Sequence, residues 1–173
     1  MDELLAKAAN IKLLILDVDG VLSDGKLYFS NSGDEMKAFS TLDGQGIKML
    51  QRNGIEVGII TGRTSALVQR RADNLGIKHL VQGREDKLVA LKEMSAMLNI
   101  DSEHIAYMGD DLPDLAAIRH AHLGITVADG HAFVAEHADW ITSARGGNGA
   151  VREACEFLLK AQGKLSQAWQ HYL

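Results

Sequence analysis

Short apolar runs alternate along the chain with amphipathic segments, a pattern typical of buried strands alternating with helices. The runs that predict strands lie at residues 13–16, 56–61, 78–82, 104–109, 123–127 and 140–142. The segments that predict helices lie at residues 1–10, 47–53, 64–75, 86–98, 112–121 and 149–162. This alternation implies right-handed crossovers and a Rossmann-like three-layer α/β sandwich with a mostly parallel sheet.

Three segments fall outside the alternation. Residues 26–40 hold two strand-like runs around the turn cluster Asn31–Asp34, which predicts a β-hairpin flap. Residues 41–46, with two glycines, are predicted to form a loop, and residues 163–173 a tail. The length suits one core, so we expect a single domain over residues 1–173.

Composition narrows the classes of function. The chain has 173 residues, of which 46% are hydrophobic and 24% charged, and a net charge of −5. That charge offers no basic surface for nucleic acid, and no apolar run approaches the roughly 20 residues that span a membrane. The single cysteine, Cys155, fits a reducing compartment, and the first residues lack a signal-peptide pattern. We therefore expect a cytoplasmic enzyme or binding domain.

Candidate chemistry begins where the first predicted strand ends. Asp17 and Asp19 follow residues 13–16 and would point to the same side of an extended backbone. Gly20 then allows the chain to leave the sheet. Two carboxylates this close repel each other unless a cation lies between them. The pair indicates either a magnesium-dependent site with Asp17 as nucleophile or a strand that runs into an acidic turn.

Polar clusters also follow three later strands. Thr61-Gly62-Arg63 opens a helix and suits a phosphate, although an ordinary helix cap has the same pattern. Lys87 lies in a first helical turn, where a cation is unfavourable unless it has a function or full solvation. Residues 109–114 hold three carboxylates, a set that Mg²⁺ could bind.

This ordered set of motifs resembles the haloacid dehalogenase superfamily of phosphotransferases over nearly the whole chain. Further segments resemble its capless subgroup, and within it the 3-deoxy-D-manno-octulosonate 8-phosphate phosphatase family of lipopolysaccharide synthesis. Those segments are residues 17–25, the hairpin, 43–48, 61–63, 70–71 and 146–153. The resemblance implies a sugar-phosphate phosphatase. Related sugar-acid phosphatases, such as those acting on acylneuraminate 9-phosphate, stay open as an alternative.

The resemblance also implies individual roles. Asp17 is the expected nucleophile, and Asp19 the acid that protonates the leaving oxygen and later the base for water. Mg²⁺ is the expected cofactor, held by Asp17, the backbone carbonyl of Asp19, and Asp110. Asp111 and Asp114 are expected to support these ligands. The groups expected to hold the phosphoryl group are Thr61, Gly62 and Lys87.

A sugar acid also needs a partner for its carboxylate. Arg63 and Arg71 are eight positions apart, so on one helix they could share a face. Arginine grips a carboxylate with paired hydrogen bonds. We expect Arg71, with Lys48 and the Asp43-Gly44 loop, to bind the acid end, and Arg63 to lie nearer the phosphate. A solvated helix face is the alternative for Arg71.

The hairpin predicts assembly, because an isolated two-stranded hairpin with aromatic residues is marginal in water. By resemblance, such hairpins form a barrel in a homotetramer, and a neighbour's C-terminal segment closes the site. Trp169 and Tyr172 in the tail could serve that purpose.

Two other classes share parts of the pattern. A phospho-receiver domain also uses clustered aspartates, but its acidic pair comes early, whereas Asp110-Asp111 comes late. A non-catalytic module could keep the fold without turnover. Magnesium-dependent hydrolysis would exclude both classes.

Overall fold

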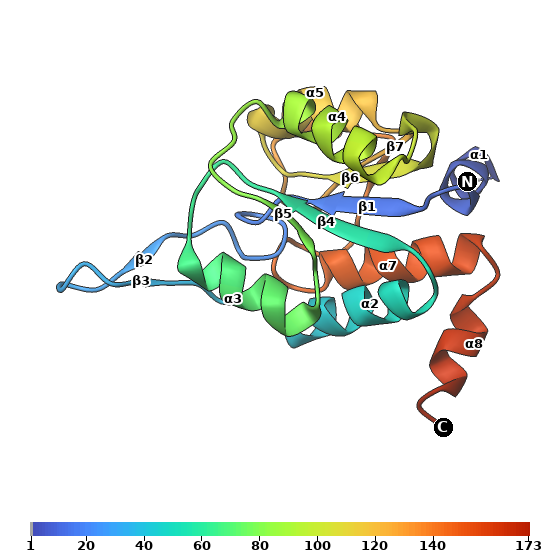
Figure 1. Cartoon of the computed structure of the whole chain (residues 1–173), viewed down its shortest axis with the longest axis horizontal. Helices are drawn as coiled ribbons and strands as arrows, with labels where there is room; N and C mark the ends of the chain where they lie inside the picture. Colours follow the sequence, from blue (N-terminus) through green and yellow to red (C-terminus); the bar gives the residue numbers. More distant parts are fainter. Residues whose placement is uncertain (1) are drawn as a thin grey trace.

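A six-stranded sheet forms the middle layer of the protein (Figure 1), seen in a computed structural model that describes residues 2–173. In spatial order its strands are β5 (His79–Val81), β4 (Glu56–Ile60), β1 (Leu13–Leu16), β6 (Ile105–Met108), β7 (Leu123–Thr126) and β8 (Trp140–Ile141). Every neighbouring pair is parallel. The predicted Rossmann-like α/β fold is confirmed.

Helices cover both faces of this sheet (Figure 1). One face carries α1 (Asp2–Ala9), α2 (Thr41–Arg52), α3 (Ala66–Leu75) and α7 (Ala150–Ala161). The other carries α4 (Lys87–Leu98), α5 (Leu115–His120) and the unpredicted α6 (Ala132–Ala135). Two 3-10 turns, η1 (Ser102–His104) and η2 (Leu112–Asp114), precede β6 and α5. Within residues 2–173, none of the helices has the length and apolar character to cross a membrane.

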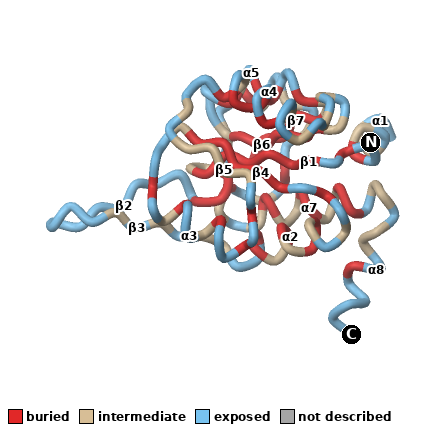
Figure 2. Tube along the Cα trace, viewed as in Figure 1, coloured by how far each residue is buried: buried red, intermediate tan, exposed pale blue. Residues whose placement is uncertain are grey.

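The strands are buried on both sides, which explains their unbroken apolar sequences. Along β1, Leu14 and Leu16 join the core beneath α2 and α7, whereas Leu13 and Ile15 join the core beneath α4 and α5. Figure 2 shows the buried strands inside a shell of more exposed helices and loops. The result is a rigid sheet whose strand ends can hold polar groups in fixed positions.

The segment at 41–46 belongs to α2, so the prediction of a loop there is wrong. Ser40 caps the helix by accepting hydrogen bonds from two amides of its first turn. The glycines serve packing rather than a turn. A Cβ at Gly44 would lie 2.4 Å from Nη2 of Arg71, and one at Gly46 would lie 3.0 Å from the α7 backbone.

The predicted hairpin is present as β2 (Tyr28–Phe29) and β3 (Glu35–Met36), which are antiparallel. It projects from one end of the molecule, and the C-terminus lies at the other end (Figure 1). The segment predicted as a tail contains a further helix, α8 (Leu165–Gln170), anchored by the buried Ala168.

Candidate active site

The ends of four strands open into one cavity of about 570 Å³. Because β4, β1 and β6 are neighbours, the residues that follow them meet at the same edge of the sheet. The cavity is lined by Asp17, Asp19, Gly25, Thr61, Gly62, Arg63, Glu85, Lys87, Asp110, Asp111, Pro113 and Asp114. The structure therefore brings together the four predicted motifs, although they are far apart in the sequence.

A buried lysine lies between two buried carboxylates at the floor of this cavity. Nζ of Lys87 lies 2.9 Å from Oδ1 of Asp17 and 2.7 Å from Oδ1 of Asp114. Burial and the neighbouring charge of Asp114 raise the pKa of Asp17 to about 8, against the opposing effect of Lys87. One lysine thus lies between two carboxyl groups, and a further positive charge would stabilise the ionised form of both.

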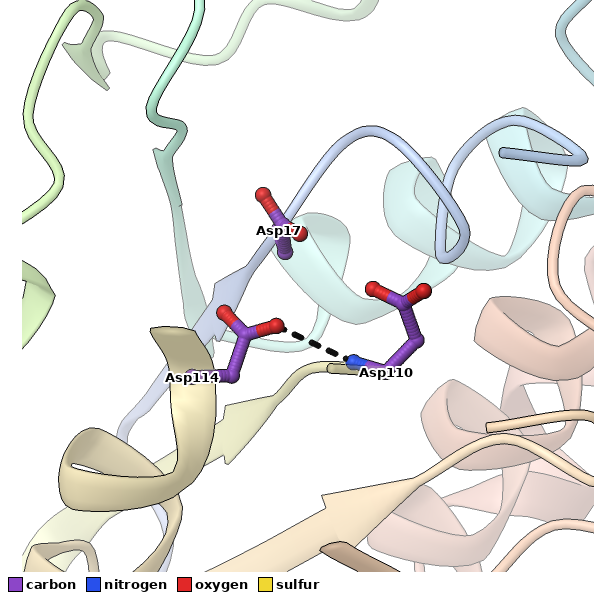
Figure 3. Close-up of side chains that lie close together, drawn as sticks. All are labelled: Asp17, Asp110 and Asp114. Carbon is purple, nitrogen blue, oxygen red and sulfur yellow. Dashed lines mark hydrogen bonds between the residues drawn. The ribbon is translucent and has the colours of Figure 1, made fainter. Parts of the chain in front are cut away.

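The acidic residues fit a divalent cation such as Mg²⁺. One carboxylate oxygen from each of Asp17, Asp110 and Asp114 lies within 4.8 Å of the others (Figure 3). Burial, with the charges of Asp114 and Asp111, raises the pKa of Asp110 to about 7. Carboxylate oxygens are the ligands that Mg²⁺ prefers, and a cation there would offset their repulsion.

Asp114 has protein partners for both of its oxygens. Oδ1 accepts hydrogen bonds from Lys87 and from the buried Tyr107 hydroxyl, at 2.7 and 2.8 Å. Oδ2 accepts a hydrogen bond from the Asp110 amide at 3.1 Å (Figure 3) and another from the Asp111 amide at 3.3 Å. These contacts suit a supporting residue that orients the loop carrying Asp110. Tyr107 was not predicted as a site residue, and its hydroxyl is the polar side-chain atom in an otherwise apolar strand.

Asp19 lies at the rim, between two cations. Its carboxylate is 2.5 Å from Nζ of Lys37 and 3.9 Å from Nε of Arg63. Lys37, at the base of the hairpin, was not predicted as a site residue, because nothing in its local sequence links it to Asp19.

Arg63 does not lie on a helix. The helix α3 begins at Ala66, two positions after the predicted start, so the expectation that Arg63 and Arg71 share one helical face is wrong. Thr61 is buried, and its Oγ1 accepts the amide of Arg63 at 3.4 Å, which turns the chain at the strand end. Arg63 then reaches across to Glu35, with Nη2 3.2 Å from Oε1.

The residues expected at the acid end lie apart from this cavity. Asp43 is 1% exposed, and its carboxylate oxygens accept hydrogen bonds from the amides of Gly149 and Arg152. It therefore caps α7 and does not lie in a loop at the substrate. Arg71 donates to the Ser40 carbonyl and lines a second cavity of about 300 Å³ with Lys37 and Arg70. Of the other two predicted residues, Gly44 is packed under Arg71 and Lys48 is half-buried on α2.

Several known proteins similar to this chain are named as phosphatases. The model of the haloacid dehalogenase-like hydrolases matches residues 79–153. The 3-deoxy-D-manno-octulosonate 8-phosphate phosphatase KdsC of Escherichia coli K12 is 51% identical over 166 residues, which are 96% of this chain and 88% of that protein. A crystal structure of the Moraxella catarrhalis phosphatase of that name, in complex with magnesium ion, phosphate ion and KDO, has 48% identity and a TM-score of 0.98, covering 100% of this chain and 99% of that one. A probable YrbI family phosphatase from Pseudomonas syringae has 55% identity and a TM-score of 0.98, covering 99% and 98%.

Proposed function

This chain belongs to the haloacid dehalogenase-like hydrolases, in the family of the 3-deoxy-D-manno-octulosonate 8-phosphate phosphatases, and we propose that it has their activity. It hydrolyses 3-deoxy-D-manno-octulosonate 8-phosphate to the free sugar acid and phosphate, with Mg²⁺ as cofactor, in lipopolysaccharide synthesis. The observation that carries this proposal is the buried Asp17–Lys87–Asp114 set beside Asp110 at the sheet edge. With Cys155 buried and free, the cytoplasm is the proposed compartment.

The reaction proceeds in two displacements. A carboxylate oxygen of Asp17 attacks phosphorus and forms an aspartyl-phosphate, while the bond from phosphorus to the sugar oxygen breaks. Asp19 gives its proton to that leaving oxygen and then takes a proton from the water that releases phosphate and restores Asp17. Asp17, the carbonyl of Asp19, and Asp110 would hold Mg²⁺, which when bound neutralises charge between the nucleophile and the phosphate.

Three other groups hold the phosphoryl oxygens in this proposal. They are the Thr61 hydroxyl, the Gly62 amide and the Lys87 ammonium, all of which line the cavity. Lys87 also keeps the Asp17 carboxylate in place through their 2.9 Å ion pair. Fixed donors of this kind act without reorganising during the reaction, which is how electrostatic stabilisation accelerates phosphoryl transfer.

A phosphate-release assay with and without Mg²⁺ tests the proposal. We expect 3-deoxy-D-manno-octulosonate 8-phosphate to be hydrolysed with a higher kcat/KM than acylneuraminate 9-phosphate or hexose phosphates, and EDTA to stop the reaction. Preference for the acylneuraminate would establish the alternative sugar-acid substrate. Absence of turnover on every phosphate ester would contradict the proposal and indicate a non-catalytic module.

We propose that Arg71 binds the carboxylate of the sugar acid, with Lys48 on α2 as a second cation for it. Asp43 and Gly44 then serve to position this part of α2. We expect Arg71→Ala to lower kcat/KM on the sugar acid by about 10- to 100-fold, the worth of a charged hydrogen bond, and to change a neutral sugar phosphate little. Arg119→Ala, on the opposite face of the sheet, is the control. Equal losses on both substrates would reject the carboxylate role.

We further propose a homotetramer held together through the hairpin. Leu27, Phe29 and Met36 are 46%, 61% and 59% exposed, which leaves an apolar surface in need of a partner. The tail packs on its own subunit, where Nη1 of Arg52 donates to the Tyr172 hydroxyl at 2.9 Å, away from the hairpin (Figure 1). If the tail covers an active site, that site therefore belongs to a neighbouring subunit of the tetramer.

We expect Phe29→Asp to yield monomers and reduced activity, because a buried charge at the hairpin contact would cost several kcal/mol. Light scattering and phosphate release measure the two effects. Phe133→Asp, which changes an exposed aromatic residue outside the hairpin, should leave both unchanged. A Phe29→Asp monomer with full activity would refute assembly-dependent function.

A further inference from the structure

At the base of the hairpin, Asp19 and three other charged side chains form a closed ring. Nζ of Lys37 lies 2.5 Å from Oδ1 of Asp19 and 3.4 Å from Oε1 of Glu35. Glu35 in turn pairs with Nη2 of Arg63 at 3.2 Å, and Nε of Arg63 lies 3.9 Å from Asp19. Three segments of the chain thus meet at this one carboxylate.

The strand pattern explains how the hairpin reaches the site. Glu35 and Lys37 are two positions apart, so they point to the same side of the strand, and the intervening Met36 points away and is 59% exposed. The Lys37 side chain is only 1% exposed, although most of the hairpin is in solvent. A lysine side chain with so little exposed surface loses rotamer freedom and needs carboxylate partners for its charge. Asp19 and Glu35 are those partners.

We propose that Lys37 is a positioning residue that holds Oδ1 of Asp19, so that the side chain is oriented for its other oxygen, when protonated, to give the proton to the leaving oxygen. The proposal rests on the proposed function, since it assumes that Asp19 is the acid. It gives the hairpin a role in chemistry as well as in assembly. A two-stranded hairpin is marginally stable by itself. Contacts that order the hairpin therefore also hold Lys37, which orients Asp19.

A pair of aryl phosphates separates this role from a structural one. Departure of p-nitrophenolate needs little protonation, whereas the more basic phenolate needs the acid, and the two substrates have nearly the same shape. We expect Lys37→Met to lower kcat/KM by about 10- to 100-fold on phenyl phosphate and by less than about threefold on p-nitrophenyl phosphate. Because kcat/KM covers only the steps through phosphoenzyme formation, later hydrolysis of the phosphoenzyme does not affect the comparison.

Two further variants complete the experiment. Lys37→Arg keeps the charge and should restore part of the activity on phenyl phosphate, and Lys26→Met removes an exposed hairpin lysine and should change neither substrate. Equal losses on both aryl phosphates would overturn the positioning role and leave a structural ion pair. If wild-type protein hydrolyses no phosphate ester with Mg²⁺, the proposed function fails first.

A crystal structure of Lys37→Met gives a readout that does not depend on activity. We expect the Asp19 side chain to adopt another rotamer or to lose order, with Asp17 and Lys87 unmoved. An Asp19 carboxylate in its original position would overturn the proposal, whatever the kinetics.

Discussion

Asp17→Asn is expected to lower kcat for the sugar phosphate by on the order of 10⁴-fold or more. The amide has no charged oxygen with which to attack phosphorus, yet it has the same size and can still accept a hydrogen bond from Lys87, now 2.9 Å from Asp17. The fold should therefore survive, and the loss should appear in kcat rather than as unfolding. Phosphate release by purified protein, with circular dichroism to check the fold, measures both.

Asp19→Asn separates nucleophile from acid. Attack needs only Asp17, so this variant should accumulate a phosphoenzyme on an activated aryl phosphate, visible as added mass in acid-quenched intact protein. Asp17→Asn should show no added mass, and Asp101→Asn, at an exposed position outside the cavity, should behave as wild type. Hydrolysis by Asp17→Asn at a near-normal rate would rule out Asp17 as the nucleophile.

The sheet and most of the cavity could be predicted because their signals are local. A strand such as Leu13–Leu16 is an unbroken apolar run, and the position of the next residue, Asp17, is fixed by the end of that strand. Once the strands are parallel, all such residues must lie at one edge. The order of the strands in the sheet then determines which of these residues are neighbours. Thr61 and Asp110 therefore lie near Asp17, although no local sequence signal pairs them.

The failures concern contacts between distant segments. Glycines at 44 and 46 predicted a loop because glycine disfavours a helix locally, but close packing on Arg71 and on α7 requires them. That error also placed Asp43 in a loop near the substrate, when its oxygens cap α7. Lys37 was missed for the same reason, since its pairing with Asp19 depends on how the hairpin folds back.

Lys87→Met is expected to be the most destabilising single change in the site. Met keeps much of the volume of lysine but leaves Asp17 and Asp114, which are 5% and 1% exposed, without their shared cation. Removing one partner from a buried ion pair costs about 3–5 kcal/mol. For a chain of this length such a loss corresponds to a Tm lower by about 6–20 °C. Urea unfolding in Mg²⁺-free buffer measures the difference, and Lys92→Met, at an exposed position on the same helix, should stay within about 0.5 kcal/mol of wild type.

The pH dependence identifies the cause of that loss. In the folded protein the pKa of Asp17 is raised from 3.8 to about 8, so the native state binds a proton that the unfolded chain has released. Stability therefore falls as pH rises between those values. Lys87 opposes that shift, so without it the pKa of Asp17 rises further. Below pH 8 Asp17 is protonated in both folded proteins and adds a constant amount to the deficit, whereas above about pH 8 only the wild type releases the proton, so the deficit of Lys87→Met should grow there. A deficit that stays constant as pH rises above 8 would show that lost packing, rather than the unpaired carboxylates, destabilises the variant.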